Sequence, residues 1–241
     1  MKRLTTILAS LFLVAACSGQ AGSSATPGAA TASPVASATA VQALEAVERG
    51  NQLAPGPYVL HYSSIGGVEA YPTLAITFSV PVGWQTVMLD GVLWHDGGTR
   101  LGFVVADNLF VDPCDGDKGL RSPAIGPSVD DLARELETVP GWQVIEKSED
   151  TYFGYQGVRL VLAGPADLSA CGEAGDRVSL LMHILGNPGV VVAISEDERH
   201  DLRILDVAGT RLIVDAITVD GATAGARAGL TEILDSISIQ P

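Results

Sequence analysis

Side chains that could transfer protons gather in one polar stretch, Ser195 to Asp201, between two predicted strands. Within it, Glu198, His200 and Asp201 place an imidazole beside carboxylates, a combination that can act as acid and base or hold a metal ion. A solvated loop tip explains the same residues more simply. The stretch is therefore a candidate site with a polar loop as its alternative.

A second group of carboxylates follows a predicted strand. Asp112, Asp115 and Asp117 lie at the start of a glycine-containing loop. Hard cations such as calcium bind oxygen clusters of this kind. The spacing departs from the usual Asp-rich loop, and Lys118 adds a competing positive charge. The sequence favours a solvated loop here and predicts no bound metal.

The nearest match to a serine-hydrolase elbow is the stretch around Ser128. It reads Gly126-Pro127-Ser128-Val129-Asp130 and lacks the final glycine of the GxSxG pattern. Ser128 is explained instead as the N-cap of a helix. The sequence therefore assigns no catalytic residue and implies no cofactor.

The N-terminus predicts a lipid anchor. Two basic residues precede an apolar run that is too short to span a bilayer as a helix. The run ends in Leu13-Val14-Ala15-Ala16-Cys17, which resembles the bacterial lipobox. Cys17 would carry a diacylglycerol group after cleavage, and additional acylation would make the anchor stable. An ordinary signal peptide cut at Ala16 is the alternative.

Three parts follow from this interpretation. Residues 1–16 form the lipoprotein signal peptide, and residues 17–40 form the lipidated cysteine with a spacer of small, uncharged residues. Such a spacer buries too little surface to fold, so we expect it to be disordered. Residues 41–241 remain, about 200 residues, which is ordinary for one domain.

Two cysteines remain after Cys17. In an oxidising compartment Cys114 and Cys171 are expected to form a disulfide. Two free thiols or a metal site are the alternatives, although the chain has no CxxC spacing and no histidine beside either cysteine in sequence.

The charge balance excludes some partners. The formal net charge is −14, and cleavage would also remove Lys2 and Arg3. A chain this acidic is poorly suited to nucleic acid or to the surface of anionic lipid. The membrane partner predicted by the sequence is therefore reached through the lipid at Cys17.

Hydrophobic periodicity predicts mostly strands with few helices. A short helix is expected at 41–49, a longer one after Ser128, and a third at 222–234. The strands are expected at 58–62, 74–80, 87–89, 92–95, 102–111, 143–147, 151–155, 158–163, 179–185, 190–194, 202–207 and 211–219. A hairpin turn is expected at 155–157. Hairpin-length connections predict an α+β domain with a mainly antiparallel sheet and helices packed on it.

Several stretches are similar to a group of uncharacterised bacterial lipoproteins. They are Leu53–Tyr58, Ile76–Trp84, Asp112–Cys114, Gly126–Leu132, Leu205–Ile213 and Ile233–Ile237. The order of strands and the terminal helix resemble the Mog1/PsbP-like α/β sandwich. The resemblance implies this fold and an envelope location, and no activity. The cysteine positions of that group are kept as Cys114 and Cys171, which favours the disulfide.

These features predict a lipid-anchored protein on the extracytoplasmic side of a bacterial cell membrane. The absence of a catalytic motif favours a non-catalytic binding or accessory module of the cell envelope, contacting an envelope protein or a small ligand. The alternative is an envelope hydrolase that uses His200 and nearby carboxylates.

Overall fold

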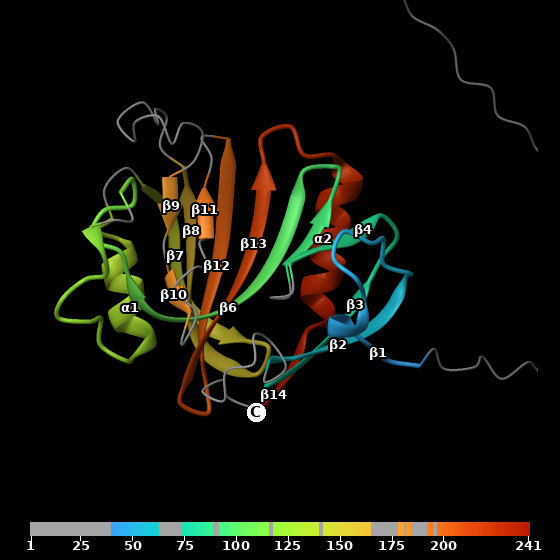
Figure 1. The fold of residues 1–241 in the computed structure, drawn as a ribbon, viewed down its shortest axis with the longest axis horizontal. Helices are drawn as coiled ribbons and strands as arrows, with labels where there is room; N and C mark the ends of the chain where they lie inside the picture. Colours follow the sequence, from blue (N-terminus) through green and yellow to red (C-terminus); the bar gives the residue numbers. More distant parts are fainter. Residues whose placement is uncertain are drawn as a thin grey trace, which may run out of the picture. The chain divides into compact units, whose positions relative to one another are not determined.

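The computed structural model describes residues 40–62, 74–88, 92–115, 118–139, 142–164, 178–180, 182–184, 192–194 and 197–241, all in the unit Thr39–Pro241. The predictions for residues 1–39, including the signal peptide, Cys17 and most of the spacer, lie outside the described residues, as do Asp117 and Cys171. Within them, mainly antiparallel sheets and two helices confirm the predicted α+β class (Figure 1).

The larger sheet has eight strands among the described residues. In spatial order they are β4 (Trp84–Met88), β5 (Val92–His95), β6 (Thr99–Leu109), β13 (Thr210–Val219), β12 (Glu198–Val207), β8 (Tyr155–Ala163) and β7 (Gln143–Tyr152), with β10 (Met182–Ile184) also paired to β6. Every pairing is antiparallel. Strands β12 and β13 form a hairpin through Ala208 and Gly209, which confirms the strands predicted at 202–207 and 211–219 as neighbours.

Two smaller sheets complete the described strands. One contains β1 (Gln42–Ala43), β2 (Gly56–His61), β3 (Ala75–Val80) and β14 (Ser238–Gln240), and the other pairs β9 (Val178–Leu180) with β11 (Val192–Ile194). The helix predicted at 41–49 is wrong. Gln42 and Ala43 pair in parallel with Tyr58 and Val59, and only one turn of 3-10 helix, η1 (Leu44–Ala46), follows.

The two helices begin at side-chain caps. Helix α1 (Val129–Leu136) starts at Ser128, whose hydroxyl accepts the backbone N–H of Asp131, while the Asp131 carboxylate accepts that of Ser128. This capping box confirms the structural explanation of Ser128. Helix α2 (Ala224–Ser236) starts at Thr223, whose hydroxyl accepts the backbone N–H of Ala226.

The helices cover opposite faces of the large sheet (Figure 1). Helix α1 packs on β8 and β12, and Arg211 of β13 donates to the carbonyls of Gly126 and Ser128 just before it. Helix α2 packs on β6 and β3, on the face where Phe103 meets Phe78 with ring centroids 5.5 Å apart. We call these the α1 face and the α2 face.

Several strand boundaries differ from the predictions, and two of these differences matter for the site. Strand β7 is continuous where two strands were predicted, and its turn to β8 lies at Phe153 and Gly154 rather than at 155–157. Both turn residues have positive φ, 54° and 89°, as a tight hairpin of this kind requires. Strand β12 begins at Glu198, inside the stretch predicted to be a loop.

Candidate functional site

The polar stretch before residue 202 is divided between the two faces of the sheet. Because successive strand residues point to opposite faces, Glu198 and His200 lie on the α1 face and Asp201 lies on the α2 face. The structure therefore brings Glu198 and His200 together and separates both from Asp201. The polar-loop interpretation is wrong for residues 198–201, since they belong to strand β12, and Glu198, His200 and Asp201 each pair with a charged residue of another strand.

On the α1 face, three buried charged residues and the partly exposed Arg100 form a network across three strands. The Nδ1 of His200 lies 2.9 Å from the Asp215 carboxylate on β13, and its Nε2 lies 3.6 Å from Glu198 Oε2. Glu198 Oε1 lies 2.7 Å from the guanidinium of Arg100 on β6, and that guanidinium lies 4.7 Å from the centre of the Trp94 ring. Two positive and two negative groups thus balance one another.

The network keeps His200 protonated. Burial alone would lower the pKa of His200, but the charge and hydrogen bond of Asp215, together with Glu198, raise it to about 9. At neutral pH the imidazole is therefore a cation held between two carboxylates. Its Nε2 has no hydrogen-bond partner, because Glu198 stands just beyond bonding distance.

This network is arranged as a structural ion cluster. The side chain of His200 is 0% exposed, so no substrate atom could reach it without a rearrangement of the sheet. A general base must contact the proton that it removes, and a base with a pKa near 9 is already protonated at neutral pH. In the described chain, neither His200 nor the surface pair His61–Glu45 is hydrogen-bonded to a serine or cysteine. The hydrolase alternative therefore gains no support from this geometry.

The other predicted carboxylates lie elsewhere. His200 shares a cross-strand row with Arg100 at the start of β6. The other end of that strand, Leu109, is nine residues and roughly 30 Å away at about 3.3 Å per residue, and Asp112 lies beyond it. Asp112 and Asp115 both contact Lys118, at 2.6 and 3.7 Å. The hydrogen bond from Lys118 lowers the pKa of Asp112. Over the described ranges, no three His, Cys, Asp or Glu side chains are grouped to hold a metal ion.

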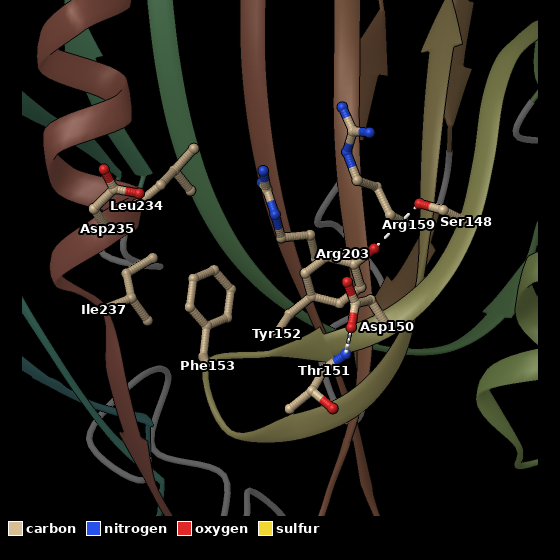
Figure 2. Close-up of a pocket in the computed structure, with 10 residues that line it drawn as sticks. All are labelled: Ser148, Asp150, Thr151, Tyr152, Phe153, Arg159, Arg203, Leu234, Asp235 and Ile237. Atoms are coloured by element: carbon tan, nitrogen blue, oxygen red, sulfur yellow. Dashed lines mark hydrogen bonds between the residues drawn. The ribbon is translucent and has the colours of Figure 1, made fainter.

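An open cavity of about 590 Å³ lies on the α2 face, between the β7–β8 hairpin and the C-terminal end of α2 (Figure 2). The hairpin contributes aromatic and polar side chains, and α2 with the residue after it contributes two apolar side chains and the carboxylate of Asp235. Two arginines come from the neighbouring strands. The lining residues are Ser148, Asp150, Thr151, Tyr152, Phe153, Arg159, Arg203, Leu234, Asp235 and Ile237.

The two arginines of the cavity share one carboxylate. Arg159 of β8 donates from Nε and Nη2 to Asp201 at 2.8 and 3.1 Å, which raises the pKa of Arg159. Its Nη1 donates to Glu146 at 2.6 Å. Arg203 of β12 makes one longer bond to Asp201, 3.3 Å from its Nη2, and its Nη1 is buried without a hydrogen-bond partner. Arg203 is therefore the arginine with unused donors.

Sequence reasoning missed this cavity because its residues come from three strands and a helix. Arg159 and Arg203 are direct cross-strand neighbours, yet they are separated by more than forty positions. One signal was available: Arg199, Asp201 and Arg203 alternate with buried residues, so one face of this strand is charged.

No protein-family model matches the chain, and no curated protein matches it in sequence. Among solved structures it is similar to LpqN of Mycobacterium tuberculosis, described as involved in cell envelope biogenesis, with 14% identity and a TM-score of 0.39 over 78% of this chain and 93% of LpqN. A likeness of this size assigns no family. None of the helices in the described residues is long and apolar enough to cross a membrane.

Proposed function

We propose that this chain is a lipid-anchored, extracytoplasmic binding module whose ligand site is the cavity between the β7–β8 hairpin and α2. The lipobox-like end at Cys17 supports the anchor, and the spacer to residue 40 supports a domain held off the membrane surface. A disulfide between Cys114 and Cys171 belongs to the same proposal.

The observation that carries the binding role is the unused donor of Arg203 at this cavity. Buried polar atoms are usually hydrogen-bonded, and among the five buried side-chain atoms of the described residues that have no hydrogen-bond partner, the Nη1 of Arg203 is the one that belongs to a residue lining this cavity. The cavity volume of about 590 Å³ lies within the range of small-molecule sites, and the cavity combines a largely polar and charged lining with a smaller aromatic and aliphatic part. The enclosed ion cluster at His200 offers no comparable access.

Hydrogen exchange on the purified, detergent-solubilised lipoprotein tests this site. A panel of amino acids, short peptides, sugars, fatty acids and nucleotides is screened for compounds that slow amide exchange. We expect at least one class to protect residues 148–159 and 230–237, and we expect Arg203→Met to remove that protection.

Arg199→Met is the matched control. Arg199 lies four positions earlier on the same face of β12 and is exposed outside the cavity, so its variant should bind like the wild type. The proposal fails if no class protects these segments, or if the protection survives in the Arg203→Met variant.

A further inference from the structure

We infer that the cavity binds a zwitterion with an apolar body, namely an apolar amino acid or a short peptide with free termini. This inference rests on the proposed binding function and specifies its ligand. The carboxylate would meet Arg203, the apolar part would lie against the hairpin and α2, and the ammonium group would face the carboxylates of the rim.

Arg203 is suited to a carboxylate because its guanidinium is only partly used. Its one hydrogen bond is the 3.3 Å contact with Asp201, a carboxylate that Arg159 already holds through two shorter bonds. The free Nη1 lies beneath the cavity surface. Turning the guanidinium toward the opening would break only the longest bond of this group and leave Asp201 paired. A carboxylate could then accept two parallel N–H bonds, the geometry that arginine favours.

The apolar wall faces this arginine. Figure 2 shows Phe153 from the hairpin close to Ile237, with Leu234 of α2 above them and the Arg203 side chain on the other side of the cavity. The guanidinium carbon of Arg203 is 6.0 Å from the ring centres of both Tyr152 and Phe153. A ligand that meets Arg203 would therefore place its adjoining carbon atoms against aromatic and aliphatic surface.

The charges of the lining select against a simple anion. Asp150 and Asp235 line the same cavity and are exposed, and they add two negative charges beside arginines that already pair with Asp201 and Glu146. A doubly charged phosphate would be repelled by this rim, whereas an ammonium group would be attracted. A ligand with one negative and one positive charge matches both parts of the site.

A set of three dipeptides separates these contributions. Leu-Phe with free termini, its C-terminal amide and its N-acetyl form differ by one charge each. Calorimetry on the detergent-solubilised lipoprotein should give a dissociation constant at least tenfold lower for the free dipeptide than for the amide. N-acetylation should weaken binding by a factor of three or more.

Substitutions connect each charge to its residue. Arg203→Met should weaken the binding of the free dipeptide at least tenfold, so that it binds no better than its amide. Arg199→Met should leave the dissociation constants of both compounds unchanged. Arg203→Lys keeps the positive charge but lacks the two parallel N–H donors of the guanidinium, and it should give an intermediate loss of affinity. The combined change Asp150→Asn and Asp235→Asn should remove the difference between the free and N-acetyl forms.

The outcomes separate this inference from the proposed function. If the amide binds as tightly as the free dipeptide, or no dipeptide binds while another class protects the cavity from exchange, the zwitterion inference is overturned and the binding site stands. If no class of the panel protects the cavity, both fail.

Discussion

The imidazole of His200 donates its Nδ1–H to the carboxylate of Asp215 at 2.9 Å, between adjacent strands in the interior of the sheet. Both side chains are almost fully buried, 0% and 3% exposed. Isolated charges at such depth would cost far more than a domain's net stability, so each group depends on the other. The stability of the sheet is therefore coupled to this pair.

Asp215→Asn is expected to destabilise the domain by about 3–5 kcal/mol, because it leaves a buried imidazolium without its main counter-charge. Urea unfolding at pH 7 measures this loss. Asp220→Asn, an exposed position just after the same strand, should change the free energy of unfolding by less than about 0.5 kcal/mol. A loss below about 1 kcal/mol for Asp215→Asn would show that the pair is not a stabilising element.

The same pair predicts a pH dependence. The pKa of His200 is raised to about 9 in the folded chain from an unfolded value of 6.5, so the folded state binds the proton more tightly. The contribution of the protonated His200 to the free energy of unfolding is therefore fully present below pH 6.5 and is lost as the pH rises through 9. The free energy of unfolding falls by on the order of 3 kcal/mol over this pH range.

Urea unfolding of the wild type and of His200→Gln at pH 6, 7.5 and 9.5 measures this contribution. The difference in the free energy of unfolding between the two proteins should shift steadily against the wild type as pH rises. A difference that stays constant over this range would contradict the raised pKa.

The elements that were predicted correctly are those whose signal is local. Ile76, Phe78 and Val80 alternate with less buried residues and form one side of β3, all at most 2% exposed. Ser128 and the acidic residues after it mark the start of α1. In each case a periodicity or a cap within a few residues determines the backbone conformation.

The start of β12 was missed because its stabilisation is non-local. From the sequence alone, Glu198 and His200 are predicted to be solvated. Only strand pairing places Arg100 and Asp215 beside them. Asp215, a charge inside the apolar run 212–217, was the available clue that a buried partner exists. The cavity was missed for the same reason, since Arg203 meets Phe153 only through the fold.

Arg211→Met should destabilise the attachment of α1. The buried guanidinium donates to the carbonyls of Ala106, Gly126 and Ser128, and these acceptors would lose a charged donor. We expect a loss of about 2–4 kcal/mol in urea unfolding and faster amide exchange in α1. Arg134→Met is the control, because Arg134 is 66% exposed and pairs only locally with Asp131, so its loss should stay below about 0.5 kcal/mol. Equal effects of the two variants would contradict this assignment.

The proposed Cys114–Cys171 disulfide predicts that the unreduced mature chain takes up no iodoacetamide at either cysteine. Reduction should expose two thiols and lower the free energy of unfolding by about 4 kcal/mol, because the bridge restricts a long segment of the unfolded chain. Intact-mass measurement before and after reduction counts the iodoacetamide adducts, and urea unfolding measures the loss of stability. Cys114→Ser should leave one alkylatable thiol at Cys171, whereas two adducts on the unreduced wild type would refute the bridge.

The proposed membrane location depends on Cys17. If its thiol carries the diacylglycerol, a metabolically supplied alkyne-tagged fatty acid should label the wild type, and the mature N-terminus should begin at residue 17 with the added lipid mass. Cys17→Ser should lose the label because serine offers no thiol for the thioether bond, and Cys114→Ser should keep it. The acyl chains hold the protein through about 0.8 kcal/mol for each buried methylene, so the labelled chain should also partition into detergent. A mature chain that begins at Cys17 with an unmodified thiol and stays in the aqueous phase would rule out the anchor.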